Sequence, residues 1–282
     1  MRIDLHLHTT ASDGSDSPEM LVWRTHAEGI SIISVTDHDT VTGIAPARRA
    51  LPDGTVLING VELSCVTSGE GAFRCHILGY GFDPEAAPMR SAIAEGARKR
   101  REKLDARLYY LSAAFGIKFP EDEIAAIAAY NSVSKIHLAR LLIAHGYAAD
   151  VGSAIDKYLG VRSPDDRIDA GMAIDAIRAS GGIAVWAHPI GGEREVRLSE
   201  GELFRRACEL RDLGIEGLEG YYSRYTAADR APILSAAREL DLLISGGSDY
   251  HGMNKTVPLG CLDADGREID SASITLLERL GI

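Results

Sequence analysis

The sequence predicts an α/β fold in which a mainly parallel sheet forms a closed or nearly closed barrel that carries a helical insert. Two observations predict it. Short apolar runs alternate with stretches of helical periodicity along much of the 282-residue chain, the pattern of βαβ units. Between about residue 85 and residue 169 the strand signals vanish and helical signals replace them.

The apolar runs that predict strands lie near residues 2–8, 30–36, 56–63, 75–81, 182–187, 215–219 and 241–246. Amphipathic stretches between them predict helices at residues 18–28, 42–50, 172–179, 202–213 and 227–240. Most of these stretches are followed by a glycine or a turn, which can end a helix. Seven strands alternating with helices suggest that the sheet closes or nearly closes on itself.

Residues 85–169 are predicted to form an inserted helical subdomain, so the barrel would comprise residues 1–84 and 170–282. Helices are expected at 93–114, 121–129, 134–145 and 150–159. The insert contains 13 Lys and Arg against 12 Asp and Glu, so it carries +1 and the rest of the chain carries −12. The basic residues of 98–103 are either a solvated helix face or part of a lid that recruits an anionic substrate.

Composition excludes several classes of protein. Hydrophobic residues make up 45% and charged residues 25% of the chain, as in soluble globular proteins. A net charge of −11 disfavours binding to duplex DNA or to an anionic membrane. Four widely spaced cysteines indicate reduced thiols rather than a disulfide framework, and neither a signal peptide nor an apolar run of 18 residues is recognisable. The expected location is the cytoplasm.

The first strand carries the strongest chemical signal. Successive side chains of a strand alternate between its two faces, so His6 and His8 share one face while the intervening apolar residues share the other. In a barrel the two imidazoles would point inward at the carboxyl end of the strand, where such folds place their active sites. A single core histidine is usually structural, but a pair with no apolar neighbours indicates metal ligands.

Further polar residues follow the other predicted strands. Asp13 would on its own be read as a turn or capping residue. His38 ends the apolar run 30–35 and is flanked by Asp37 and Asp39, one of which is expected to accept a hydrogen bond from its ring and fix the tautomer. Glu62 ends another apolar run, where a buried carboxylate would be costly without a cation, although a surface strand end is the alternative.

An antiparallel return of the chain after residue 66 would bring His76 to the same rim as Glu62. His188 ends the strand at 182–187, and Asp249 and His251 follow the strand at 241–246. Six of the nine histidines therefore fall at predicted strand ends. This clustering predicts a metal centre at one rim of the barrel.

The order of these motifs closely resembles the polymerase and histidinol phosphatase (PHP) family along the whole barrel. The matching motifs are H-x-H, Asp13, T-D-H-D, G-V-E-L-S, C-H-I-L-G-Y, A-H-P and S-D-Y-H-G. The helical insert with its S-K-I-H-L-A-R segment is similar to the bacterial branch of 3′,5′-nucleoside bisphosphate phosphatases and RNA 5′-end exonucleases, although that branch often has Arg-Pro where this chain has Lys135-Ile136.

The resemblance implies a distorted (β/α)7, TIM-like barrel with two or three divalent ions. It assigns His6, His8, Glu62 and Asp249 to one ion, Glu62, His76 and His188 to a second, and Asp13, His38 and His251 to a third. Manganese is the expected metal, and iron or zinc would also suit mixed imidazole and carboxylate ligands.

Three divalent ions would outweigh the three carboxylates and leave the rim at about +3 in a chain of −11, which favours an anionic substrate there. The expected reaction is hydrolysis of a phosphate monoester of a small phosphorylated nucleotide by a metal-bridging hydroxide. The favoured substrate is the 3′-phosphate of a 3′,5′-nucleoside bisphosphate. His188 or Asp249 is a candidate for proton transfer.

A second phosphate of the substrate would need its own contacts, and Ser134, Lys135 and His137 are the candidates in the insert. The alternative is an ordinary helix start, with Ser134 as the cap and Lys135 exposed. Arg194 and Arg224, on loops after strands, are further candidates.

Other functions stay open at this stage. An H-x-H strand and a late aspartate also occur in metal-dependent amidohydrolases, although these need no ligands equivalent to Asp13 and His38. Histidinol phosphate, or short RNA or DNA oligonucleotides cut from the 5′ end, could be the substrate instead. A non-catalytic metal or nucleotide sensor and a polymerase-associated proofreading module are less consistent with a complete ligand set on a short chain.

Overall fold

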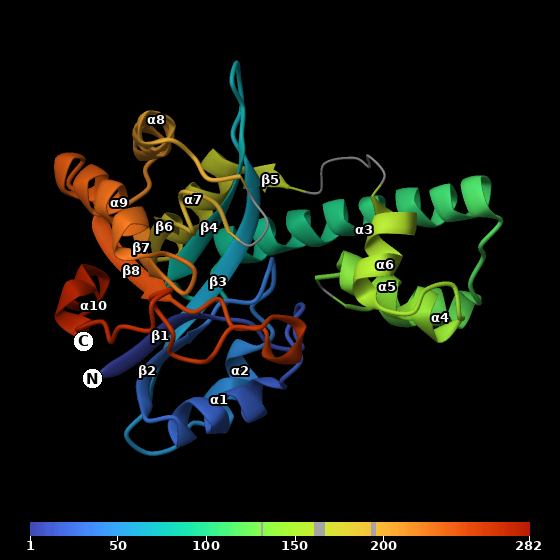
Figure 1. Cartoon of the computed structure of the whole chain (residues 1–282), viewed down its shortest axis with the longest axis horizontal. Coiled ribbons are helices and arrows are strands. Elements are labelled where there is room, and N and C mark those ends of the chain that lie inside the picture. The colour runs from blue at the N-terminus through green and yellow to red at the C-terminus, as the bar shows by residue number, and fades with distance from the viewer. Residues whose placement is uncertain (131, 161–166, 193–195) are drawn as a thin grey trace.

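The structure is a computed structural model that describes residues 1–130, 132–160, 167–192 and 196–282. Its centre is one sheet, onto which helices pack (Figure 1). The strands are β1 (Arg2–Leu7), β2 (Ile30–Val35), β3 (Val56–Val66), β4 (Arg74–Tyr80), β5 (Ile168–Asp169), β6 (Ile183–Trp186), β7 (Gly217–Tyr222) and β8 (Leu243–Gly247). All seven predicted strands are present. The short β5 was not predicted, because two residues show no periodicity.

The sheet follows the order β1-β2-β3-β4-β6-β7-β8, and β5 pairs with β3 off this path. Neighbouring strands are parallel except that β4 is antiparallel to both β3 and β6. The two ends of the sheet meet where the His8 amide donates to the Tyr250 carbonyl at 2.9 Å and the Asp249 amide donates to the His6 carbonyl at 2.9 Å. The sheet is therefore a nearly closed barrel, and the predicted α/β barrel fold is confirmed.

Four of the helices around the barrel begin where the sequence supplies a capping side chain. Hydroxyl oxygens of Ser17, Ser199 and Thr226, and a carboxylate oxygen of Asp169, accept hydrogen bonds from backbone amides in the first turns of the helices that follow them. These helices are α1 (Pro18–Ala27), α7 (Ala170–Ala179), α8 (Glu200–Asp212) and α9 (Ala227–Glu239), with α2 (Ile44–Arg49) and α10 (Thr275–Arg279) beside them. Two 3-10 turns, Gly252–Asn254 and Ser271–Ser273, lie near the C-terminus.

The alternation predicted for the first strand is present. Ile3 and Leu5 are buried in the main apolar core, whereas His6 and His8 on the other face are buried among polar groups. The carboxyl ends of the parallel strands thus carry the polar side chains of the barrel interior.

The helical insert consists of α3 (Ala87–Phe115), α4 (Glu121–Ala128), α5 (Lys135–Ala144), α6 (Val151–Ala154) and the π-helical turn Ile155–Leu159. Met89, near the start of α3, packs in the barrel core, whereas Leu104 and Leu111 further along α3 pack with Leu138 and Leu142 in a separate core. The long α3 therefore contributes to the core of the barrel and to that of the insert, and Figure 1 shows the insert projecting from one side.

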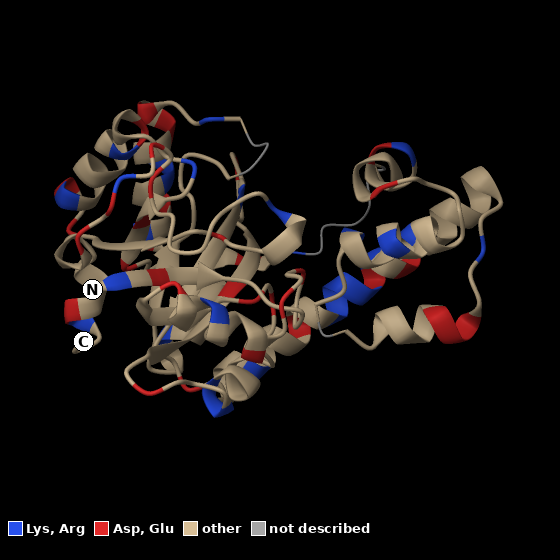
Figure 2. Ribbon diagram, turned by 60° about the horizontal axis from the view of Figure 1, so that its bottom comes forward, with Lys and Arg blue, Asp and Glu red and all other residues tan. Residues whose placement is uncertain are grey.

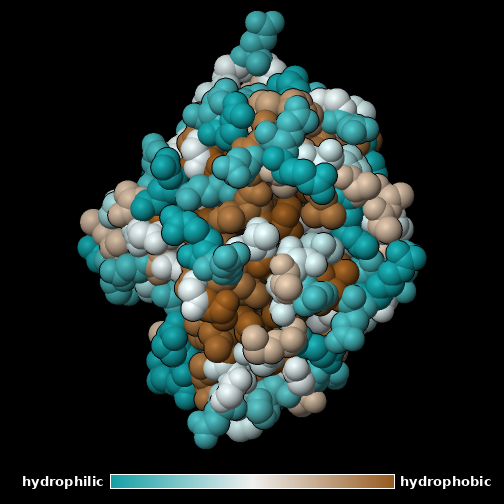
Figure 3. Space-filling model, turned by 90° about the vertical axis from the view of Figure 1, so that its left-hand side faces the viewer, coloured by the Kyte–Doolittle hydropathy of each residue, from teal (hydrophilic) through white to brown (hydrophobic). Residues whose placement is uncertain are grey.

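On the opposite side of the molecule, apolar residues gather in the middle of the face and hydrophilic residues surround them (Figure 3). Among the described residues, no helix combines the length and the apolar character needed to cross a bilayer.

Candidate metal centre

The structure brings the nine predicted ligands together at the carboxyl end of the barrel. They come from five places along the chain: β1 and the loop after it, the end of β2, the β3–β4 hairpin, the end of β6 and the end of β8. Three groups have ligand atoms that lie within 4.8 Å of one another: His8, Asp13, His38 and His251; His6, His8, Glu62 and Asp249; and His38, Glu62 and His76. His188 joins the last two groups through Glu62.

Glu62 lies at the centre of the cluster. Its Oε2 is 3.1 Å from His6 Nε2, 3.2 Å from His8 Nε2 and 3.2 Å from His38 Nδ1. Its Oε1 is 2.8 Å from His76 Nδ1 and 3.2 Å from His188 Nε2. The antiparallel pairing of β3 with β4 places His76 here, as the predicted hairpin required. One carboxylate facing five imidazoles is suited to bridge two cations.

Several ligand atoms of the cluster are buried without a hydrogen-bond partner in the described part of the chain. His6 Nε2, both ring nitrogens of His8, His38 Nδ1 and Glu62 Oε2 are buried, yet none has a hydrogen bond of acceptable geometry among the described residues. Buried polar atoms without partners are costly, and cations bound within the cluster would supply partners for them. The donor set of imidazoles and carboxylates therefore fits divalent metal ions.

Asp249 is held from behind by two groups that the sequence did not reveal. Its Oδ2 accepts hydrogen bonds from the Tyr222 hydroxyl at 2.9 Å and from Lys255 Nζ at 2.7 Å. Its Oδ1 faces the cluster, 3.3 Å from His8 Nε2. This arrangement leaves one oxygen of Asp249 for a metal and uses the other to orient the side chain.

A third part of the cluster lies around Asp13. Its Oδ1 is 3.3 Å from His251 Nε2 and 3.8 Å from His8 Nδ1, and its Oδ2 is 4.0 Å from His38 Nε2. The ring of His251 is oriented by its Nδ1, which is 2.9 Å from the Asp249 carbonyl oxygen. Asp13 therefore faces three imidazoles, although a turn position alone did not distinguish it from a capping residue.

Sequence reasoning missed Glu219, which lies on β7 and is completely buried. Its Oε1 is 2.8 Å from His6 Nδ1, and its Oε2 accepts a hydrogen bond from the His188 amide at 2.7 Å. Glu219 thus fixes the ring of one candidate ligand and the backbone of another. The signal was available, because a carboxylate within an apolar strand is the same observation that singled out Glu62.

The expectation that Asp37 or Asp39 fixes the His38 ring is wrong. Asp37 accepts hydrogen bonds from the Thr9 amide at 2.8 Å and the Ser12 hydroxyl at 2.7 Å, so it braces the loop before Asp13. Asp39 accepts from Arg100 Nε at 2.7 Å. Neither carboxylate is hydrogen bonded to His38 in the described part of the chain, because both side chains turn away from the ring toward backbone and arginine donors.

Burial and mutual contact shift the pKa values of the cluster in opposite directions. Burial disfavours a charged imidazole, yet Glu219 and Glu62 hold the pKa of His6 well above its usual range. Against the same burial, Asp249 and Glu62 raise the pKa of His8 to about 9. Burial dominates at His38 and lowers its pKa. Burial would raise the pKa of Glu62, but the surrounding imidazoles lower it well below its usual range, so this carboxylate stays ionised.

Two candidate ligands have strained backbones. His188 has a φ of 30° and Asp249 a φ of 59°, in the left-handed region that residues other than glycine rarely adopt. Each lies two residues beyond the end of a barrel strand, β6 for His188 and β8 for Asp249. Such strain is typical of residues that a site holds in a required orientation.

A cavity of about 390 Å³ lies in front of the cluster. Its barrel wall includes Glu62, His188 and Asp249, and its other wall includes Ile136 and Ile155 of the insert. A second cavity of about 200 Å³ continues toward α3, where Lys and Arg positions are frequent (Figure 2). The second cavity is lined by Asp13, His38, Ser64, His76, Arg100, Lys103, Arg107, Ser134, Lys135 and Arg167.

The predicted substrate-binding residues have mixed positions. Ser134 caps α5, as the alternative interpretation expected, and its amide donates to His137 Nδ1 at 3.0 Å. Lys135 is exposed but lines the basic cavity beside Ser134. Arg224 lies in the turn after β7, where its carbonyl accepts a hydrogen bond from Arg197. Arg194 lies outside the described residues.

A barrel with a buried cluster of imidazoles and carboxylates at the carboxyl end of its strands has the architecture of metal-dependent hydrolases. No family model matches the chain. It is 33% identical over 89% of its length to a 5′-3′ exoribonuclease of Haemophilus influenzae, of which it covers 90%. It is 30% identical over 88% of its length to a 3′,5′-nucleoside bisphosphate phosphatase of Chromobacterium violaceum, of which it covers 87%.

A phosphoribosyl 1,2-cyclic phosphate 1,2-diphosphodiesterase of Eggerthella lenta is 30% identical over 90% of this chain and 96% of its own length. The solved structure of a metal-dependent phosphoesterase from Bifidobacterium adolescentis superposes with a TM-score of 0.76 at 27% identity, covering 95% of this chain and 96% of its own. A structure from Chromobacterium violaceum described as an amidohydrolase has a TM-score of 0.75 at 27% identity, covering 93% of this chain and 94% of its own. The chain belongs to the PHP family of metal-dependent phosphoesterases.

Proposed function

We propose that this phosphoesterase hydrolyses a phosphate ester of a small phosphorylated nucleotide, and that its preferred substrate is the 3′-phosphate of a 3′,5′-nucleoside bisphosphate. The observation that carries the proposal is the pair of adjoining cavities. One is lined by the candidate metal ligands. The other is lined by Lys135, by arginines of α3 and by Arg167, which directly precedes β5. Two anion sites side by side suit a substrate with two phosphates.

The nine clustered side chains are proposed to hold the metals: His6, His8, Asp13, His38, Glu62, His76, His188, Asp249 and His251. Manganese is the proposed ion, with iron and zinc as the alternatives. When bound, divalent ions lower the pKa of a coordinated water and neutralise charge on phosphate oxygens.

The chain's own residues then orient the substrate and handle protons. Lys255 Nζ lines the cavity and carries a positive charge next to Asp249, where it can stabilise a phosphate oxygen. Asp249 accepts two hydrogen bonds and its pKa is lowered although burial opposes this, so it is better suited to ligation than to proton donation. Of the two residues predicted for proton transfer, His188 is therefore the preferred candidate, and the proton would come from Nδ1, because Nε2 faces Glu62 at 3.2 Å and would bind the metal.

A second candidate function is 5′-3′ hydrolysis of short RNA or DNA oligonucleotides. The similarity to the Haemophilus influenzae exoribonuclease over 89% of the chain supports it. The reaction at phosphorus would be the same, and only the groups outside the metal cluster would distinguish the two substrates.

A substrate panel tests the proposal. The purified protein, loaded with Mn²⁺ and with its metal content measured, is assayed on adenosine 3′,5′-bisphosphate, 5′-AMP, histidinol phosphate, a short 5′-phosphorylated RNA and an amide substrate. We expect the highest kcat/KM on the bisphosphate. Equal rates on every monoester would contradict a second phosphate site, and a preference for the RNA would establish the second candidate. Hydrolysis of the amide alone would contradict both.

A further inference from the structure

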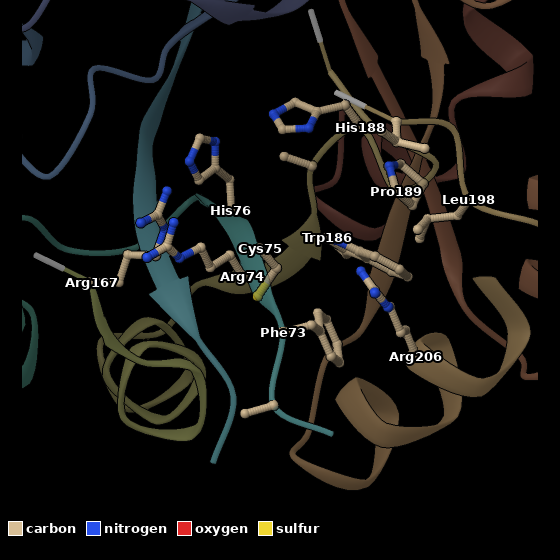
Figure 4. Close-up of a pocket in the computed structure, with 14 residues that line it drawn as sticks. Phe73, Arg74, Cys75, His76, Arg167, Trp186, His188, Pro189, Leu198 and Arg206 are labelled. Carbon is tan, nitrogen blue, oxygen red and sulfur yellow. The ribbon is translucent and has the colours of Figure 1, made fainter. Parts of the chain in front are cut away.

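A third cavity, of about 450 Å³, adjoins the metal cluster and shares Arg167 with the basic cavity described above. It lies between the β3–β4 hairpin, the end of β6 and helix α8 (Figure 4). We term it the hairpin pocket and define it by Phe73, Arg74, Arg167, Trp186 and Arg206. Its volume falls in the range of about 300–1,000 Å³ that is usual for small-molecule sites.

The hairpin pocket is continuous with the candidate metal centre. His76 and His188 line both this pocket and the cavity in front of the metal ligands. In Figure 4 the two rings stand at the same end of the hairpin pocket. A ligand group in the hairpin pocket would therefore be separated from a phosphate at the cluster by the side chains of His76 and His188.

The pocket combines an apolar floor with cationic walls. Phe73 and Trp186 are buried with their ring centroids 6.1 Å apart, and the guanidinium carbon of Arg206 lies 4.5 Å from the centroid of the Phe73 ring. Arg206 Nε also donates to Glu202 at 2.6 Å, which fixes the guanidinium plane. A fixed, planar guanidinium can stack on a nucleobase and attract a phosphate.

Arg74 and Arg167 stand together on the opposite wall (Figure 4). Among the described residues that line the pocket there is no Asp or Glu. The ligand that fits is therefore an anion with a flat or apolar part, as a nucleotide is.

We propose that the hairpin pocket binds the second nucleotide of a short single-stranded oligonucleotide whose scissile phosphate lies at the metal cluster. This inference rests on the second candidate function, hydrolysis of short oligonucleotides, and adds a binding subsite for that substrate. A nucleoside bisphosphate needs only the cluster and the basic cavity toward the insert. An oligonucleotide continues beyond the scissile phosphate, and the hairpin pocket, which shares His76 and His188 with the cavity of the metal centre, offers space for that continuation.

The test compares Arg206→Ala with Arg211→Ala, because Arg211 lies on the same helix, is exposed and pairs with its neighbour Asp212. We expect Arg206→Ala to lower the ratio of kcat/KM for a 5′-phosphorylated RNA trinucleotide to that for adenosine 3′,5′-bisphosphate by about 10-fold, the usual effect of losing a stacking contact. Arg206→Glu should lower the ratio further, and Arg211→Ala should leave it unchanged.

Binding provides a readout that is independent of turnover. Fluorescence anisotropy of a labelled RNA trinucleotide with the metal-free protein should show weaker binding for Arg206→Ala and Arg206→Glu than for the wild type and Arg211→Ala. Equal affinities, or equal losses on both substrates, would overturn the inference. A wild-type protein that binds the trinucleotide but hydrolyses no phosphate ester with metal present would contradict the proposed function and leave the pocket assignment intact.

Discussion

The barrel rim and the helical insert face the same cavities but are built differently. At the rim, the candidate ligands Glu62, His6 and His8 are completely or almost completely buried and are fixed by neighbours such as Glu219. On the insert, Lys135 is exposed at the first turn of a helix. The rim residues are thus held in fixed positions, as metal ligation requires, whereas the insert carries its charge on a long, exposed side chain. The difference suggests that the rim determines the reaction and the insert determines the substrate.

If the rim determines the reaction, changes there should affect every substrate equally. The largest effect is expected for Glu62→Gln, because this side chain faces five imidazoles. We expect loss of bound metal and a fall in turnover of more than about 1,000-fold on all phosphate esters. Metal analysis and steady-state kinetics measure this. Glu70→Gln, at an exposed position of the β3–β4 hairpin, is the control and should change neither.

Asp13→Asn tests whether the rim holds a third ion. The variant should bind one metal ion fewer per chain than the wild type and lose about 100-fold in turnover, since the charge opposite His251 and His38 is removed. Asp53→Asn, at an exposed loop position, serves as the control. Unchanged metal content and turnover in Asp13→Asn would show that the centre has at most two ions.

Glu219→Gln separates ligation from orientation. Glu219 lies behind His6 and His188, so removing its charge should weaken metal affinity by about 10- to 100-fold while leaving the number of ions unchanged. Titration of the metal-free protein with Mn²⁺ measures the affinity. Glu216→Gln, three residues earlier and outside the cluster, should bind metal like the wild type.

Lys135→Ala addresses the insert, where the effect should be smaller and selective. We expect KM for adenosine 3′,5′-bisphosphate to rise about 5-fold with little change in kcat, because an exposed ion pair contributes up to about 1 kcal/mol. Activity on a substrate with one phosphate should stay the same. Lys118→Ala, an exposed lysine elsewhere in the insert, is the control. A loss on both substrates would place Lys135 in the chemistry and break the distinction between rim and insert.

Metal binding at the rim should also release protons. The carboxylates raise the pKa of His6 well above its usual range against the effect of burial, and they raise that of His8 to about 9, so these two rings carry protons near neutral pH without metal. Metal must displace those protons. Mn²⁺ affinity should therefore rise with pH up to about 9, and calorimetry in buffers of different ionisation enthalpy should detect the release. A pH-independent affinity would contradict these protonation states.

Most of the fold followed from local patterns. The seven strands of the barrel path could be located because apolar runs of four or more residues show their periodicity directly. β5 was missed, because two residues pair with β3 only through the tertiary fold. The helix predicted at 93–114 begins earlier, at Ala87, because Met89 and Ala92 pack against the barrel, and helical periodicity alone does not show where that packing starts.

The candidate site shows the same division. His6 and His8 could be placed on one face by strand alternation, and the others by their position at strand ends. The groups that hold these ligands in place could not be predicted from the sequence. Glu219 contacts His6, which is 213 positions away in the sequence, and Lys255 contacts Asp249, which is 6 positions away. Neither contact follows from a local rule of sequence spacing. Asp39 was assigned to the neighbouring ring, but its partner Arg100 lies 61 residues further along the chain.

The sequence by itself determined the order of strands and helices and the side chains available for metal binding, because backbone periodicity is a local property. Only the tertiary structure decided which of those side chains face one another, which groups hold them, and that three cavities meet at the rim. Those features depend on closing the barrel between β1 and β8 and on docking the insert, and both join residues that are far apart in the chain.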